Sequence, residues 1–231
     1  MSDARQHHSP EILRQQVSAV LQRFEHPTLQ QDLIRLKAVR HVALLDNILH
    51  IEIVMPFAWQ SAFEALQRTA QQQLLQLSGA QGIEWRLSCD IATLKRVKNQ
   101  PSSHGVKNII AVSSGKGGVG KSSTAINLAL ALQAEGARVG LLDADIYGPS
   151  VPLMMATEQQ RPSSPDGKHW APGMAHGLAT TSIGDLVTED NALVWRGPRA
   201  SKDFGRFLKV TLMPGLRYLI LYITPGTGVV P

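Results

Sequence analysis

The sequence GKGGVGKS at residues 115–122 constrains the fold more than any other feature of this chain. It has the spacing G-x-x-x-x-G-K-[ST], and it lies between an apolar run at 109–112 and a predicted helix from Lys121 to about Glu135. Glycines let the backbone turn its N–H groups toward an anion without Cβ clashes, and the start of a helix adds a positive dipole end. This order predicts a phosphate-binding loop in an α/β domain with a doubly wound parallel sheet.

The residues of this loop are predicted to bind the phosphates of a nucleotide. Lys121 can place its charge on the β- and γ-phosphates, the Ser122 hydroxyl suits Mg²⁺, and Ser123 can also reach a phosphate. The candidate binding residues are Gly115, Lys116, Gly117, Gly118, Val119, Gly120, Lys121, Ser122 and Ser123. A glycine-rich turn with a purely structural role is the alternative interpretation.

Two carboxylates follow the next predicted strand, at residues 138–142. Asp143 and Asp145 stand at its carboxyl end, which is the edge where a doubly wound sheet binds its ligand. Both side chains are therefore expected beside the phosphate loop, where carboxylates can hold Mg²⁺ through water and orient an attacking water molecule. A surface acidic turn is the alternative interpretation.

The part of the chain before residue 95 has a different pattern. Its periodicity predicts helices at 12–24 and 59–77 and strands at 41–45, 48–55 and 83–89. Asp46 and Asn47 separate the first two strands and tolerate turn geometry, so a hairpin is expected there. Together these elements form a compact α-β-β-α-β domain.

Composition divides the chain into three parts. Residues 95–107 are basic and polar and include Pro101 and Gly105, which is typical of a linker. We therefore expect a small α/β domain at 1–94, a basic linker at 95–107 and a phosphate-loop domain at 108–231.

The phosphate-loop part supplies only three predicted strands, at 109–112, 138–142 and 218–222. A doubly wound sheet normally has more strands and covering helices, so 108–231 is interpreted as the N-terminal half of such a domain.

The chain contains one cysteine, Cys89, which excludes a disulfide scaffold and any cluster held by several cysteines of this chain. Cys89 alternates with polar residues on the apolar side of a predicted strand, so a buried core thiol is expected. The histidines show no ligand-like pairing on one helix face, so no metal site is expected from them.

Several function classes are not expected from composition. A single cysteine, no signal-peptide pattern and no long apolar run predict a cytoplasmic protein. The net charge is +5, but the basic excess is concentrated in 95–107 and 196–231. We therefore expect neither a nucleic acid nor a membrane as a partner.

Three further stretches narrow the interpretation. The second lysine of the loop, Lys116, resembles the signature lysine of the family containing the nitrogenase iron protein, MinD and ParA. The sequences DADIYGPS at 143–150, WRGP at 195–198 and PGTG at 225–228 resemble the Mrp/ApbC group of iron–sulfur cluster carriers. FEHPTLQQDL and MPFAW, near residues 24 and 55, resemble the small domain that precedes the ATPase domain in bacterial Mrp proteins.

This resemblance implies a homodimeric ATP hydrolase that accepts a 4Fe-4S cluster and transfers it to apoproteins. By resemblance, Lys116 reaches the phosphates of the other subunit, Asp143 serves the Mg²⁺ ion together with Ser122, and Asp145 orients the water. Lys116, Lys121 and Asp145 are then the catalytic residues, and the small domain is of iron–sulfur assembly type.

The chain departs from the family pattern at several positions. Tyr222 stands where the family has the Walker B aspartate, and a neutral phenol cannot replace a carboxylate around hydrated Mg²⁺. Val229 replaces a residue that is usually acidic, and Arg199 replaces a methionine. The Cys-x-x-Cys that bridges the cluster in the family lies beyond Pro231, so none of the cluster cysteines is in this chain.

These departures lead us to expect a truncated chain with impaired activity. Two other functions stay open at this point: a positioning ATPase of the ParA or MinD type, and a non-catalytic remnant in which only the N-terminal domain folds well.

Overall fold

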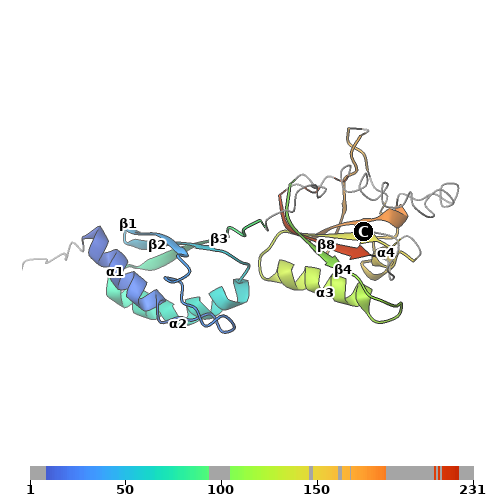
Figure 1. Cartoon of the computed structure of the whole chain (residues 1–231). Helices are drawn as coiled ribbons and strands as arrows, with labels where there is room; N and C mark the ends of the chain where they lie inside the picture. The colour runs from blue at the N-terminus through green and yellow to red at the C-terminus, as the bar shows by residue number, and fades with distance from the viewer. Residues whose placement is uncertain are drawn as a thin grey trace, which may run out of the picture. The chain divides into compact units, whose positions relative to one another are not determined.

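The computed structural model describes residues 9–93, 105–145, 148–160, 163–166, 168–185, 211, 213 and 215–223. The chain divides into two compact units, Met1–Ala92 and Thr93–Pro231, here called the first and the second unit (Figure 1). Most of the predicted linker, residues 95–104 of 95–107, lies outside the described residues. Within the described part of the chain, no helix has the length and apolar character needed to cross a bilayer.

The first unit is a three-stranded sheet with two helices packed on one face. Its elements are α1 (Pro10–Leu21), β1 (Val39–Leu45), β2 (Ile48–Met55), α2 (Gln60–Ser78) and β3 (Gly82–Cys89). The strand order is β1-β2-β3, in which β1 and β2 are antiparallel and β2 and β3 are parallel. The predicted α-β-β-α-β order is confirmed (Figure 1).

Asp46 and Asn47 form the predicted hairpin turn between β1 and β2. Both residues have positive φ, 49° and 61°, as a two-residue turn of type I′ requires. Their short polar side chains tolerate this left-handed region better than bulky side chains do. Leu45 and Ile48 can therefore pair directly across the turn.

The alternation along β2 decides which face of the first sheet is buried. Residues Leu49, Ile51, Ile53 and Met55 are buried, and the residues between them are half-buried. The core that they enter also contains the apolar side chains of both helices, including Leu13, Val17, Leu21, Phe63, Leu66 and Leu74. Apolar residues that repeat every two positions along the strand thus pack against apolar residues that repeat about every 3.6 positions along the helices.

Two predictions for the first unit are wrong. Helix α1 ends at Leu21, three residues before Phe24, which instead packs beside the core from the following turn. Cys89 is half-buried rather than a buried core thiol. It is the last residue of β3, and because β3 is an edge strand, Cys89 is covered by a neighbouring strand on one side only.

The second unit is a five-stranded sheet with α3 packed against it (Figure 1). Its elements are β4 (Val106–Val112), α3 (Lys121–Ala134), β5 (Val139–Ala144), α4 (Val151–Met154), β6 (Gly173–Ala175), β7 (Leu178–Ser182), the 3₁₀ turn η1 (Ile183–Asp185) and β8 (Leu216–Ile223). The strand order is β4-β8-β5-β7-β6. Strands β4, β8, β5 and β7 are parallel, and β6 runs antiparallel to β7.

The predicted α/β fold with a parallel sheet is confirmed, but the expectation of three strands is wrong. Strands β6 and β7 were not recognised because β6 has three residues and β7 reads LATTS, too short and too polar for a clear period. His176 and Gly177, both with positive φ, turn the chain between them. As a result β7 covers the edge of β5, and every residue of β5 is buried.

Strand β8 lies between β4 and β5, although among the described strands it comes last in the sequence. In this register Tyr222 pairs with Val112 of β4 on one side and with Asp143 of β5 on the other. Because parallel strands end at the same edge of a sheet, the phosphate loop, Asp143 and Tyr222 come together there.

Candidate functional site

The glycine loop connects β4 to α3 and is exposed to solvent. Gly118 and Gly120 have φ of 74° and 86°, in the left-handed region where a side chain causes strain. Gly120 is also the N-cap residue of α3, so the loop ends directly on the positive end of the helix. The loop geometry therefore matches the prediction of an anion-binding turn.

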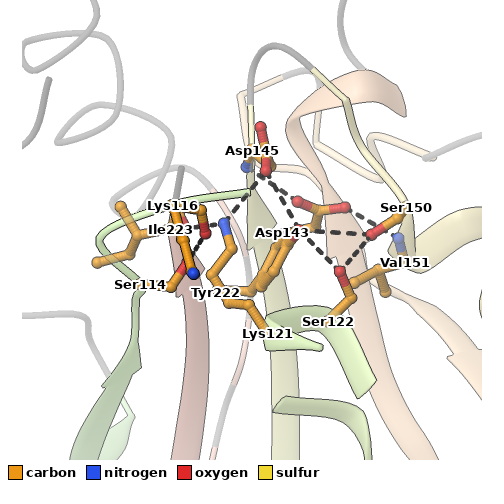
Figure 2. Close-up of polar contacts among 10 residues, drawn as sticks. All are labelled: Ser114, Lys116, Lys121, Ser122, Asp143, Asp145, Ser150, Val151, Tyr222 and Ile223. Carbon is orange, nitrogen blue, oxygen red and sulfur yellow. Dashed lines mark hydrogen bonds and ion pairs between the residues drawn. The ribbon is translucent and has the colours of Figure 1, made fainter. Parts of the chain in front are cut away.

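Lys121, the first residue of α3, is buried at the end of this loop, with 9% of its surface exposed. Its Nζ lies 3.3 Å from Oδ2 of Asp145 and donates a hydrogen bond to the backbone carbonyl of Ile223 (Figure 2). It also lies 4.1 Å from the centre of the Tyr222 ring, as in a cation–π contact. Three groups thus hold the ammonium group, one directly after β5 and two in β8.

A chain of hydroxyl groups lies next to Lys121. The Ser150 hydroxyl donates to Oγ of Ser122 at 2.8 Å, and the Ser122 hydroxyl donates to the Tyr222 oxygen at 2.8 Å. The Tyr222 hydroxyl in turn donates to Oδ2 of Asp145 at 3.2 Å (Figure 2). Each hydroxyl is a donor to the next group, and the chain ends on a carboxylate that can accept.

Asp143 is completely buried and accepts hydrogen bonds from backbone N–H groups that follow β5. Its Oδ1 accepts the backbone N–H of Asp145 at 2.9 Å, and its Oδ2 accepts that of Val151 at 3.1 Å. Burial raises the pKa of Asp143 to about 6, because loss of water disfavours the charged form more than these N–H groups favour it. Both oxygens of Asp143 therefore serve the protein backbone.

The structure brings together four of the predicted site residues, Lys121, Ser122, Asp143 and Asp145. Lys116 and Ser123 are exposed, and the carbonyl of Lys116 accepts a hydrogen bond from the Ser114 hydroxyl at 2.8 Å. The assignment of these residues to phosphates and to an attacking water stays a prediction.

The sequence analysis did not predict two residues of the candidate site, Ser150 and Tyr222. Ser150 belongs to the quoted DADIYGPS segment, and the spacing of seven residues from Asp143 was the available signal. Tyr222 was noted only as a departure from the family pattern. No local signal indicates that its hydroxyl would meet Ser122, because that contact depends on β8 lying beside β5.

The described arrangement does not fit a magnesium ion at Ser122. Mg²⁺ needs six oxygen ligands in a near-octahedral shell. The Ser122 hydroxyl is already in contact with Ser150 and Tyr222, and Oδ2 of Asp145 is in contact with Lys121 and Tyr222.

Several sequence predictions fall outside the described residues. They concern Ile146 and Tyr147 of the DADIYGPS segment, the WRGP element with Arg199, and the PGTG segment with Val229.

The position of the glycine loop defines the class of protein, since a buried lysine at the start of a helix, on the carboxyl edge of parallel strands, is the geometry of a P-loop nucleotide-binding domain. Residues 105–231 match the family described as the NUBPL iron-transfer P-loop NTPase, and this chain belongs to that family. Residues 14–85 match the iron–sulfur cluster assembly protein family.

Curated relatives agree with the predicted resemblance, which is confirmed. The iron–sulfur cluster carrier protein of Escherichia coli K12 is 63% identical over 228 residues, which are 99% of this chain and 62% of that protein. The protein of the same name from Haemophilus influenzae is 54% identical over 213 residues, 92% of this chain and 58% of that protein. The chain thus spans about three fifths of the length of these relatives.

A solved structure also aligns with part of the chain. It is a nucleotide-binding protein in complex with ADP from Archaeoglobus fulgidus, with 32% sequence identity and a TM-score of 0.41. The alignment covers 52% of this chain and 45% of that one.

Proposed function

We propose that the second unit binds and hydrolyses ATP, and that the whole protein carries a 4Fe-4S cluster to apoproteins. The observation that carries the first part is Lys121, a buried cation at the start of α3 directly after a loop with left-handed glycines. The family membership supports an NTPase, and the relatives named as iron–sulfur cluster carriers support the cargo.

In this proposal the loop residues 115–123 hold the phosphates. Backbone N–H groups of the glycines and the start of α3 bind the phosphate oxygens, and the Ser122 and Ser123 hydroxyls add hydrogen bonds. Lys121 leaves its present partners, Asp145 and the carbonyl of Ile223, and pairs with the β- and γ-phosphates.

Phosphate binding and catalysis are then linked through Asp145. Once Lys121 pairs with a phosphate, the Asp145 carboxylate loses its cationic partner and becomes available to orient a water molecule toward the γ-phosphate. Lys116, which is exposed on the loop, is free to reach the phosphates of a second copy in a homodimer. The same nucleotide thus promotes both catalysis and dimer formation.

The cluster is treated as cargo. Cys89 is the single thiol of the chain and one thiolate cannot hold a cluster of four irons alone, so the ligands must come from more than one chain or from other residues of the whole protein. The acceptors are apoproteins that lack their cluster.

Calorimetric titration of the full chain with ATP tests the nucleotide part. Wild-type protein should bind ATP with a stoichiometry of one per chain, and Lys121→Ala should lose binding by about a hundredfold or more because a charge-assisted contact is removed. Lys168→Ala, which removes an exposed lysine, is the matched control and should bind normally. Absence of binding by the wild type would refute the proposal.

Cluster transfer is tested separately, on the protein at its natural full length. Reconstitution under anaerobic conditions should give about four irons and four sulfides per dimer, and the loaded protein should activate an apoprotein that requires a 4Fe-4S cluster. Failure to acquire iron and sulfide would exclude the carrier role and leave nucleotide binding untouched.

A further inference from the structure

We propose that Tyr222 occupies the place from which a metal ion would contact Ser122, so that this chain binds ATP with little dependence on Mg²⁺. The inference rests on the proposed binding of ATP and adds a property of the site that the proposal does not contain. It is drawn from the contacts of one phenol group.

The Tyr222 oxygen is the meeting point of three polar side chains. It lies 2.8 Å from Oγ of Ser122, 3.2 Å from Oδ2 of Asp145 and 3.5 Å from Oγ of Ser150. Tyr222 itself is 3% exposed, because β8 is flanked by β4 and β5. The hydroxyl therefore occupies a closed position among these side chains (Figure 2).

The position is the one that P-loop enzymes use for the metal. In that class the serine at the start of the helix is a ligand of Mg²⁺, and a carboxylate at the end of a neighbouring strand helps to hold the ion. In this chain the serine is Ser122, and Tyr222, the last residue but one of the strand beside β4, lies opposite Val112. A phenol therefore stands where such a site needs a negative charge.

The phenol cannot supply what the ion needs. Its one proton is directed at Asp145 and its oxygen accepts from Ser122, so its hydrogen-bonding capacity is largely used by the protein. A neutral oxygen also attracts a divalent cation far less than a carboxylate does. Bringing an ion to Ser122 would require breaking these contacts, and Tyr222 would supply no negative charge in return.

The main phosphate-binding groups, which are the loop N–H groups and the Lys121 ammonium group, do not include the Tyr222 hydroxyl. The Lys121 ammonium group lies over the Tyr222 ring. The loop glycines, which direct backbone N–H groups at an anion, directly precede Lys121 in the sequence. The cation and the N–H groups remain available for phosphates when no metal is present. Affinity for ATP and dependence on Mg²⁺ are therefore separated in this chain.

The test compares ATP affinity in excess Mg²⁺ and in excess EDTA, using the full chain. In the wild type the two dissociation constants should agree within about threefold, whereas in Tyr222→Asp, which restores a carboxylate, Mg²⁺ should tighten binding by about tenfold or more. Tyr218→Phe removes a hydroxyl from the same strand, four residues away, and should keep the wild-type ratio.

The outcomes separate this inference from the proposed function. If Mg²⁺ tightens ATP binding by the wild type about tenfold or more, the inference is wrong and the proposed function stands. If the wild type binds ATP under neither condition, the proposed function fails first. The wild-type ratio decides even if Tyr222→Asp does not fold, and Tyr222→Phe, which frees Ser122 without adding charge, should then also show a ratio near one.

Discussion

Lys121 and Asp145 form a buried ion pair whose members must separate for the proposed reaction. Their exposed fractions are 9% and 6%, so neither charge is well solvated, and each depends on the other and on Tyr222. Removing one partner of a buried pair destabilises the folded protein, because it leaves the other charge uncompensated. An incoming phosphate is an alternative partner for the lysine.

Asp145→Asn should therefore lower stability and raise ATP affinity at the same time. Without the carboxylate, Lys121 no longer has to leave an anion before it pairs with a phosphate, so binding should tighten by about 1 kcal/mol, or roughly fivefold. Calorimetric titration measures the affinity, and thermal unfolding should show a lower Tm. Asp166→Asn, a change at an exposed acid, is the control and should leave the affinity unchanged. Weaker ATP binding by Asp145→Asn would contradict the competition between carboxylate and phosphate.

Asp143 should give the second unit a stability that falls with rising pH. Its pKa is about 6 in the folded chain against 3.8 for the free side chain, so the folded state holds the proton more tightly than the unfolded state. Between these two pH values the unfolding free energy falls as the pH rises. Above about pH 6 the buried carboxylate is ionised, and the loss of unfolding free energy reaches about 3 kcal/mol, which corresponds to the pKa shift.

The measurement is urea unfolding of wild type and Asp143→Asn from pH 4 to 7. The asparagine does not titrate, so the difference in unfolding free energy between the two proteins should move against the wild type by about 2.5 kcal/mol over this range. Parallel pH curves would show that burial does not shift the pKa of Asp143.

The sequence identified the loop and both aspartates because each lies within a few residues of the motif or strand that defines it. It did not identify the role of Ser150 or Tyr222. Ser150 comes from the segment between β5 and α4, and Tyr222 comes from a strand in a distant part of the chain. Contacts of this kind depend on sheet topology, which local patterns do not encode.

Helices and strands with a strong local sequence pattern were predicted correctly, whereas strands that depend on tertiary pairing were not. The turn at Asp46 and Asn47, the helices α1, α2 and α3 and the strands around the glycine loop follow from residue type and period. Strands β6 and β7 follow from neither, since the LATTS segment becomes a strand by pairing with β5. Pairing partners override a weak intrinsic preference in such short segments.

The end of α2 provides a test of a single backbone position. Gly79 has φ of 65°, and its N–H donates to the carbonyl of Leu75 at 3.0 Å, which is a left-handed helix cap. Gly79→Ala should lower the unfolding free energy of the first unit by about 1 kcal/mol, because a Cβ is unfavourable in that region. Urea denaturation followed by circular dichroism measures the change.

Gly82→Ala is the matched control for this substitution. Gly82 lies three residues further on, its φ is not positive, and its added Cβ would meet Ile48 Cδ1 at an ordinary distance of 3.4 Å. It should change stability by less than about 0.5 kcal/mol. Equal effects of the two substitutions would mean that the left-handed backbone at Gly79 is not the cause.

For the whole molecule, the division at residues 92 and 93 predicts the pattern of limited proteolysis. Trypsin should cut first in the basic stretch before β4, where Lys95, Arg96 and Lys98 offer sites just after the boundary of the two units. The first unit should then persist as a resistant fragment. ATP should slow digestion of the second unit, since binding stabilises the folded state by mass action.

Mass spectrometry of a digestion series checks both expectations, and Lys121→Ala serves as the control in which ATP gives no protection. A first cut inside β1 to β3 would contradict the division into units. Protection by ATP in Lys121→Ala as well would mean that the nucleotide acts elsewhere.

The place of β8 in the sheet has a consequence for how the chain is made. Asn108 of β4 contacts the backbone of Arg217 in β8 across 109 positions of sequence, and β8 is the strand beside β4 in the sheet. A ribosome therefore releases the glycine loop long before the strand that supports it. The first unit can complete its core while translation continues. The groups of β8 that hold the Lys121 ammonium group become available only when residues 216–223 have emerged from the ribosome. The binding site is therefore among the last parts of the described chain to be assembled during synthesis.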